Sequence, residues 1–194
     1  ATLPTNIACL AMHALHTDQE TDPMAHIDYY FTVLSPFAYL AGDRMEQVAR
    51  THGASIAYKP VDIMTLFARM GGTPPAQRHE SRKEYRMQEL ERLSALNDMP
   101  VNFQPAHWPT DQKPASALVV AAEKAGADAG ALTRAVMKAV WAEERDIADD
   151  ATLQAILSET GIDPATLAPH LDDARAAFDT MTAEGMERGV FGAP

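Results

Sequence analysis

The segment from residue 26 to residue 60 constrains the fold most, because it predicts a strand, a helix and a second strand in close succession. His26–Leu34 is short and rich in aromatic and β-branched residues, as buried strands are. Ser35 and Pro36 follow, and these types favour the N-cap and the first position of a helix. Ser55–Lys59 predicts the second strand. A strand–helix–strand unit of this length makes its two strands parallel.

Helical patterning dominates the rest of the chain. Between the two strands, apolar residues recur at helical spacing until Gly53, which is placed to end that helix. From Val61 to Gly189 there is almost no strand signal. The helices predicted there cover residues 62–70, 76–97, 115–124, 130–143, 151–159 and 172–188. The sequence therefore predicts an α/β fold, in which a βαβ core carries a large all-helical insertion over about residues 62–188.

Two parallel strands alone make a poor sheet, because buried parallel sheets usually have more members. We therefore expect the sheet to need further strands, from chain beyond Pro194 or from a partner. Residues 25–194 are expected to form one domain. Residues 1–24 are expected to form a flexible arm, and Met24 is a candidate natural start.

Composition argues against several partners and sites. The formal net charge is −11, from 16 basic and 27 acidic side chains. This balance disfavours nucleic acid and anionic membrane surfaces, both of which need clustered Lys and Arg. Cys9 is the single cysteine, so an intrachain disulfide and a cysteine-rich metal site are excluded. The histidines show no metal-ligand spacing, and no stretch is long and apolar enough to span a bilayer. The expected compartment is the cytoplasm.

Ser35 is the first candidate for chemistry, because it stands where the leading strand turns into a helix. Unpaired N–H groups and the positive end of the helix dipole gather at such a point and stabilise anions. A thiolate would be stabilised there, but the motif contains no cysteine. Two interpretations follow. Ser35 is either an ordinary N-cap, contributing about 1 kcal/mol, or a group that activates the thiol of a bound cofactor.

The stretch Tyr30–Ala41 resembles the N-terminal signature of the 2-hydroxychromene-2-carboxylate isomerases, which are relatives of kappa-class glutathione transferases and DsbA-type thioredoxin-like proteins. Where the redox members hold Cys-x-x-Cys, this chain holds Ser35-Pro-Phe-Ala38. Further segments resemble the family in order: Tyr58–Asp62, Gly71–Pro75, Tyr85 to Pro100, Pro105–Pro109, Trp141–Ile147 and Glu187–Pro194.

The resemblance implies a thioredoxin-like fold and a site for glutathione. Ser35 and Phe37 would hold the cofactor's sulfur at the start of the helix. Pro194 would be the cis-proline of the fold, and Ala193 before it would offer backbone groups to the cysteinyl part of glutathione. In such a site, the sulfur adds to a conjugated aromatic oxo-acid, a double bond rotates, and the sulfur leaves again.

The resemblance also implies substrate-binding residues, namely Lys59, Arg78, Tyr85 and Trp108, with His107 as a neighbour. A small aromatic carboxylate would suit Lys59 or Arg78 as its positive anchor. The alternative interpretation of Arg78 is a solvated surface charge. The alternative interpretation of Trp108 is an anchor of the hydrophobic core. Since family members are often dimers, a homodimer is also implied.

Two departures from the family pattern keep other functions open. Gly72 stands where a kappa-class enzyme carries Asn, and the family's segment beyond the cis-proline, which grips the γ-glutamyl end of glutathione, is not in this sequence. The alternatives are a kappa-like transferase that conjugates glutathione to electrophiles, and a degenerate thioredoxin-like binding module without catalysis.

Overall fold

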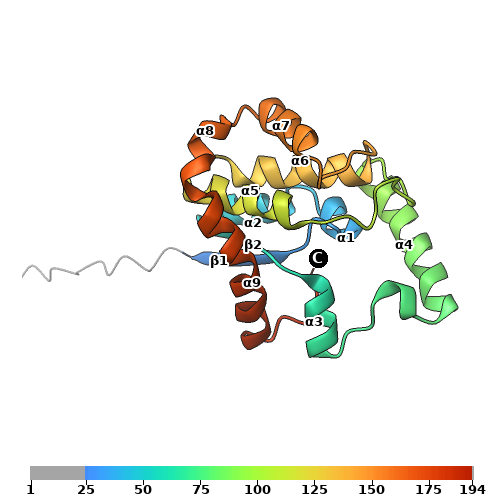
Figure 1. Ribbon diagram of the computed structural model, residues 1–194. Helices are drawn as coiled ribbons and strands as arrows, with labels where there is room; N and C mark the ends of the chain where they lie inside the picture. Colours follow the sequence, from blue (N-terminus) through green and yellow to red (C-terminus); the bar gives the residue numbers. More distant parts are fainter. Residues whose placement is uncertain (1–24, 194) are drawn as a thin grey trace, which may run out of the picture.

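The two predicted strands form one parallel sheet in the computed structural model, which describes residues 25–193 (Figure 1). Strand β1 is His26–Phe31 and β2 is Ser55–Pro60, with Tyr30 opposite Lys59. β1 is shorter than predicted, because the chain turns after it: Ser35 N–H donates to Thr32 O at 3.2 Å. Among residues 25–193, β2 pairs with one edge of β1 and no strand pairs with the other.

The connection between the strands is two helices rather than the single one expected. Helix α1 is Pro36–Leu40 and α2 is Arg44–His52. Gly42 lies between them with a φ of +59°, a left-handed conformation that interrupts helical hydrogen bonding and suits glycine. Gly53 ends α2 in the same conformation, as predicted.

Helices make up the regular structure of residues 61–193, as the sequence predicts. They are α3 (Ile63–Met70), η1 (Pro75–Gln77), α4 (Glu80–Asn97), α5 (Lys113–Lys124), α6 (Ala129–Trp141), α7 (Asp150–Glu159), α8 (Pro164–Leu167), η2 (Ala168–His170) and α9 (Leu171–Glu187). The predicted helix over 76–97 begins only at Glu80, because η1 and an extended Arg78 precede it. The short helix α8 was not predicted. No helix within residues 25–193 is long and apolar enough to cross a membrane.

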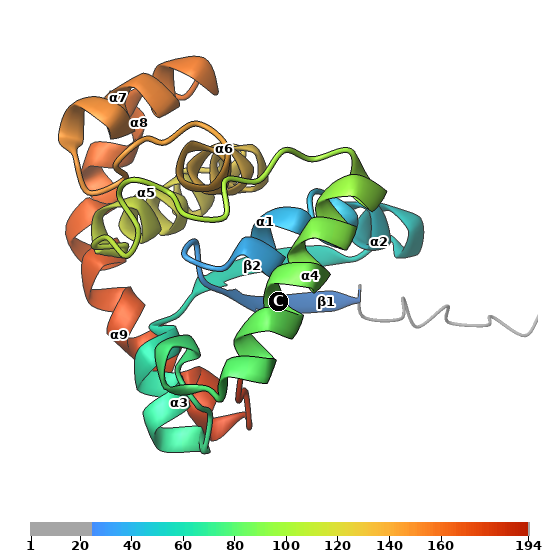
Figure 2. The same ribbon diagram turned by 90° about the vertical axis from the view of Figure 1, so that its right-hand side faces the viewer.

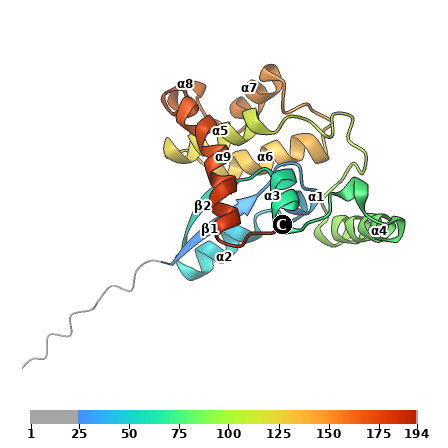
Figure 3. The same cartoon turned by 60° about the horizontal axis from the view of Figure 1, so that its bottom comes forward.

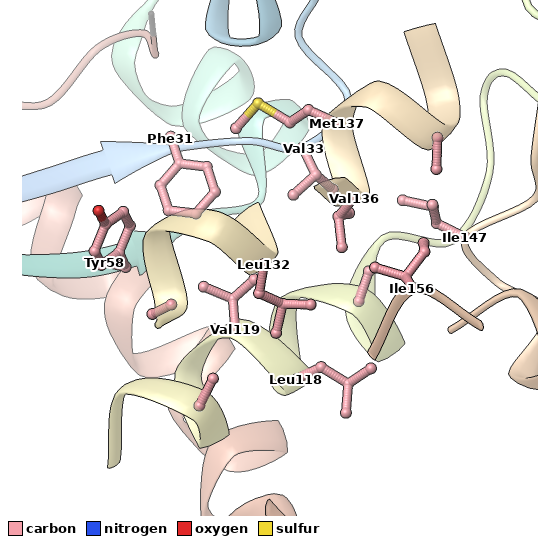
Figure 4. Close-up of a cluster of buried hydrophobic side chains, with 14 of the residues drawn as sticks. Phe31, Val33, Tyr58, Leu118, Val119, Leu132, Val136, Met137, Ile147 and Ile156 are labelled. Carbon is pink, nitrogen blue, oxygen red and sulfur yellow. The ribbon is translucent and has the colours of Figure 1, made fainter. Parts of the chain in front are cut away.

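One face of the sheet carries an aromatic cluster that packs on α6. Tyr29 stacks on Phe31 at 5.0 Å between ring centroids, and Tyr58 meets both rings edge-on. Figure 4 shows Phe31 and Tyr58 beside the α6 side chains in the main hydrophobic core. Gly130 at the start of α6 permits this close approach, because a side chain there would collide with the hydroxyl of Tyr58.

Helix α9 covers the opposite face of the sheet (Figure 3). A Cβ at Gly185 would lie 3.4 Å from the ring of Tyr30, so the helix and β1 are in close contact. Thr182 Oγ1 accepts a hydrogen bond from Asp62 N–H at 3.0 Å, which ties α9 to the start of α3.

Helix α4 lies beside α1, on the other side of the molecule from α9 (Figures 1 and 2). Asn97 near its end donates from Nδ2 to Leu40 O at 2.9 Å, and Arg44 donates to the Asn97 amide oxygen at 2.8 Å. These contacts hold the last turn of α4 against the end of α1 and the start of α2.

Candidate functional site

Ser35 caps helix α1, as predicted. The Ala38 N–H donates to Ser35 Oγ at 3.3 Å, and the Tyr39 N–H donates to Ser35 O at 3.1 Å. Pro36 has no N–H to offer. Of the first amide groups of α1, the Phe37 N–H alone therefore has no acceptor within residues 25–193. Because Ser35 Oγ acts as an acceptor in its cap, its hydroxyl proton is free to be donated. The turn presents two donors side by side.

Distant segments fix the turn that carries Ser35. The buried Thr32 hydroxyl donates to Gln112 Oε1 at 2.7 Å, just before α5, and accepts from the Leu34 N–H at 3.3 Å. Trp108 donates from Nε1 to Leu34 O at 3.2 Å. Leu34 O is the acceptor immediately before Ser35, so the indole of Trp108 lies next to the cap. These hydrogen bonds fix the backbone just before Ser35, so Ser35 has little freedom to move.

A pocket of about 490 Å³ adjoins this turn. Its walls are η1, the first half of α4, the loop from Phe103 to Trp108, and Trp141 at the end of α6. The lining residues are Pro75, Ala76, Arg78, Glu80, Lys83, Glu84, Arg86, Met87, Leu90, Phe103, Pro105, Trp108 and Trp141. The rings of Trp108 and Trp141 lie 6.0 Å apart. The pocket is therefore mainly apolar and aromatic, with charged groups of both signs along α4, namely Glu80, Lys83, Glu84 and Arg86.

Two lining residues touch the chain on either side of Ser35. Trp108 contacts Leu34, as described above. The guanidinium of Arg86 lies over the ring of Phe37, with 4.9 Å between its central carbon and the ring centroid. Burial, and then the charge of Arg78, lower the pKa of Arg86. These two contacts lie on either side of Ser35, so lining residues connect the pocket to the cap, although Ser35 and Phe37 are not themselves among the lining residues.

A second cavity, of about 270 Å³, is lined by Ala38 and Tyr39 of α1 and lies between Tyr29, Tyr58, Met99 and α6. Its main polar group is Glu46, which accepts from the Tyr58 hydroxyl at 3.1 Å and pairs with Arg134. No residue from Leu34 to Phe37 lines either hollow, but two side chains that line the larger pocket, Trp108 and Arg86, contact Leu34 and Phe37. We therefore assign the candidate site to the pocket beside Trp108.

The residues predicted from the sequence to bind substrate are not all brought together. Arg78 and Trp108 line the pocket. Arg78 donates from Nε to Thr73 O at 2.9 Å and lies over the ring of Phe67. Tyr85 is 57% exposed on α4 and is not among the lining residues, so its role stays a prediction.

Lys59 lies in an ion-pair cluster between β1, β2 and α9. Its ammonium group is 2.9 Å from Asp28 and 2.8 Å from Glu184. Burial opposes the charge on Lys59, but hydrogen bonds to Glu184 and Asp28 outweigh it and raise the pKa. The same ammonium lowers the pKa of both carboxyl groups. Lys59 does not line the pocket, so its predicted contact with substrate remains untested.

The predicted cis-proline, Pro194, lies outside the described residues, and the role of Ala193 stays a prediction. Within residues 25–193, the cis peptide bond is Trp108–Pro109. A side chain at Gly72 would overlap the ring of Phe67, so the Asn of the kappa-class pattern has no room here. No cluster of metal-ligating side chains occurs in the described part of the chain.

Comparison with known proteins identifies the fold family. Residues 26–194 match the DSBA-like thioredoxin domain. The 2-hydroxychromene-2-carboxylate isomerase of Pseudomonas putida is 33% identical over 173 residues, which are 87% of this chain and 82% of the relative. The chain belongs to the 2-hydroxychromene-2-carboxylate isomerase family. The solved structure of a 2-hydroxychromene-2-carboxylate isomerase superposes on this isomerase with a TM-score of 0.67, at 28% identity, covering 87% of this chain and 83% of the other.

More distant relatives have other activities. The kappa 1 glutathione S-transferase of Caenorhabditis elegans is 24% identical over 180 residues, or 88% of this isomerase and 79% of the transferase. The cytosolic disulfide reductase DsbM of Pseudomonas aeruginosa, solved with GSH, has a TM-score of 0.63 at 20% identity, covering 86% and 82% of the two chains. The predicted family, fold class and isomerase activity are therefore confirmed. The expected homodimer stays a prediction.

Among the pocket residues that were not predicted from the sequence, Trp141 and Arg86 matter most for the site. Trp141 was noted only as part of a family segment, and Arg86 was not singled out. Arg82, Lys83 and Arg86 are close together in the sequence, and nothing local shows that Lys83 and Arg86 line a pocket while Arg82 does not. The long helix α4 has polar residues on most sides, so the spacing of its apolar residues did not predict which side faces inward.

Proposed function

We propose that this isomerase uses glutathione to interconvert the cis and trans forms of a small aromatic oxo-acid, with 2-hydroxychromene-2-carboxylate as the first candidate. One observation carries the proposal: Ser35 O–H and Phe37 N–H at the strand-to-helix turn have no acceptor among residues 25–193, and two side chains of an aromatic pocket, Trp108 and Arg86, contact the turn. Since the turn holds no thiol of the chain itself, these donors suit a sulfur atom that arrives with a cofactor.

The two donors at the turn suit a thiolate, because each would donate a hydrogen bond to the anionic sulfur. A free thiol with a pKa of about 8.5 is only a few per cent ionised at pH 7. Hydrogen bonds from Ser35 and Phe37 favour the anion, and lowering the thiol pKa by about two units corresponds to roughly 2.7 kcal/mol. When bound, glutathione would supply a nucleophilic sulfur that adds reversibly to the conjugated double bond and is released unchanged.

The other residues would bind the organic substrate and exclude water. Trp108 and Trp141 provide flat apolar walls, which suit an aromatic ring. Arg78 and Arg86 provide positive charge for a carboxylate. Ala193 would add backbone contacts to the peptide part of glutathione, as the family resemblance implies. A cytosolic site of action belongs to the same proposal.

The direct test is isomerisation of 2-hydroxychromene-2-carboxylate, followed by ultraviolet absorbance with and without glutathione. We expect the rate to depend on glutathione, and the free thiol to be recovered in full at the end. S-methylglutathione is the matched control, because it keeps the peptide and blocks the sulfur. If calorimetry detects no glutathione binding, or if the rate is the same without glutathione, the proposal is wrong.

A kappa-like transferase activity is the second candidate, favoured by the match to a kappa-class relative over 88% of the chain. A transferase consumes glutathione in proportion to product, whereas an isomerase returns it. Measuring free thiol after complete turnover therefore separates the two. Binding of glutathione without either reaction would instead support a non-catalytic binding module.

A further inference from the structure

We propose that Arg86 is the residue that holds the carboxylate of the organic substrate, and thereby selects aromatic acids over neutral aromatic compounds. The sequence singled out Lys59 and Arg78 for this task. The inference rests on the proposed function in one respect, namely that the organic substrate occupies the pocket beside Trp108.

The surroundings of Arg86 leave its charge available. Within residues 25–193, no carboxylate forms an ion pair with its guanidinium, which lies instead on the ring of Phe37. Stacking on a ring orients the guanidinium but leaves its in-plane N–H groups free for a planar carboxylate. An arginine stays charged at neutral pH even where burial and a neighbouring cation lower its pKa.

The other charged side chains around the pocket are partnered or exposed. Lys83 pairs with Glu80 at 3.4 Å, and Glu84 is exposed on α4. Arg78 already donates through Nε to Thr73 O and stacks on Phe67. Of the cations that line the pocket, Arg86 is therefore the one without an ion-pair or hydrogen-bond partner among residues 25–193. It is also the one that touches the turn next to Ser35.

Trp141 gives an independent sign that a ligand acceptor belongs here. Trp141 lines the pocket, is 3% exposed, and has a buried indole Nε1–H without an acceptor in the described part of the chain. A buried donor left unpaired is unfavourable, and such groups usually find an acceptor. Oxygen atoms of an oxo-acid are acceptors, so the ligand class that suits Arg86 would also satisfy Trp141 once a shift of the indole exposed its Nε1–H to the pocket.

Proximity to the cap also suits the reaction. Arg86 contacts Phe37, two residues after Ser35, so an acid held at Arg86 would keep its conjugated chain near the donors at the turn. The rest of the ligand would lie against the two tryptophan rings, which are in contact with each other. Fixing the acid end while leaving the double bond beside the turn is the orientation that the isomerisation needs.

The test compares trans-cinnamate with its neutral amide, cinnamamide, by calorimetry on the full chain without glutathione. We expect Arg86→Gln to weaken cinnamate binding about ten-fold, the size of one lost charge-assisted pair. Cinnamamide should bind within two-fold of the parent value. Arg86→Lys should give an intermediate loss, and Arg82→Gln, one turn earlier and exposed, should change neither ligand. Circular dichroism and thermal melting check that each variant is folded.

Three results would overturn the proposal. Unchanged cinnamate binding in Arg86→Gln would remove the carboxylate contact. An equal loss of both ligands would make Arg86 a packing residue. A parent protein that binds cinnamate no more tightly than cinnamamide would show that the pocket does not select acids.

A glutathione titration of the same variants separates this inference from the proposed function. If Arg86→Gln loses glutathione but keeps cinnamate, the guanidinium serves the cofactor and the inference is wrong. If the parent binds no glutathione, yet cinnamate binding still depends on Arg86, the proposed function fails and the inference stands.

Discussion

The cationic side chains beside β1 and those beside the pocket have different kinds of partner. Lys59 lies 2.9 Å from Asp28 and 2.8 Å from Glu184, and Arg188 contacts the same two carboxylates at 3.0 Å. Arg86, by contrast, rests on the ring of Phe37. A cation paired within the chain serves the fold, whereas one that faces an aromatic pocket keeps its attraction for an anion.

The same contrast holds for hydrogen-bond donors. The donors of the Thr32 side chain and of the Trp108 indole meet acceptors in the chain, and so fix the turn. The donors at Phe37 N–H and Trp141 Nε1 meet none among residues 25–193. Satisfied groups around the turn hold it still, and unsatisfied ones mark where a ligand would be bound.

The largest expected effect is that of Ser35→Ala on catalysis. Loss of one hydrogen bond to a developing anion typically costs 10² to 10³ in rate, and we expect kcat for glutathione-dependent isomerisation to fall about 100-fold. Ser35→Thr, which keeps a hydroxyl, should retain more activity. Asp149→Ala is the control, because Asp149 caps α7 through Thr152 N–H, so this variant loses a cap elsewhere. A similar loss in Asp149→Ala would mean that stability, and not the hydroxyl, sets the rate.

The next effect concerns the paired cations. Lys59→Met should lower the free energy of unfolding by about 2 kcal/mol, because two partly buried carboxylates lose their main partner. The loss is smaller than for a fully buried pair, since Arg188 still contacts both groups. Urea denaturation measures it. Lys124→Met removes an exposed pair with Asp173 at 3.9 Å and should cost less than about 0.5 kcal/mol. Equal losses in both variants would contradict the structural role of the Lys59 cluster.

Local signals predicted the scaffold well. The aromatic strand, the Ser35 cap and Gly53 each depend on neighbours within a few residues, so the sequence shows them directly. Gly42 was the exception, since a single glycine within a helical pattern does not reveal whether it breaks the helix. The predicted arm of residues 1–24 and the predicted cis bond at Pro194 lie outside the described residues.

The site features that could not be predicted from the sequence depend on contacts between residues far apart in the chain. Lys59 resembled a free cation in the sequence, because Glu184 is 125 residues away and reaches it only through the packing of α9 on the sheet. Trp108 touches Leu34 across 74 residues. Arg86 faces a pocket because of how α4 is oriented beside α1. Such pairings follow from the folded arrangement of whole helices, which local periodicity does not specify.

The ion pairs of Lys59 also determine how the stability of the fold depends on pH. Hydrogen bonds from Lys59 hold the pKa of Asp28 below its ordinary 3.8, and that of Glu184 below its ordinary 4.5. A carboxyl group with a lowered folded-state pKa stabilises the fold above its unfolded pKa, and this stabilisation is lost as the pH falls through the folded value. We expect the free energy of unfolding to decline below about pH 4.5, and to decline by about 1 kcal/mol less in Lys59→Met. Parallel pH profiles for the two proteins would contradict the proposed linkage.

The smallest effect should come from the second arginine of the pocket. Arg78 lines the pocket but already donates to Thr73 O and stacks on Phe67, so less of its charge is available to a ligand than in Arg86. We expect Arg78→Gln to weaken cinnamate binding less than about three-fold, which is below 1 kcal/mol, measured by the same calorimetry. A larger loss than in Arg86→Gln would reverse the order. It would show that a guanidinium with a backbone partner can still bind the carboxylate, so that pairing within the chain would no longer separate the structural cations from the functional ones.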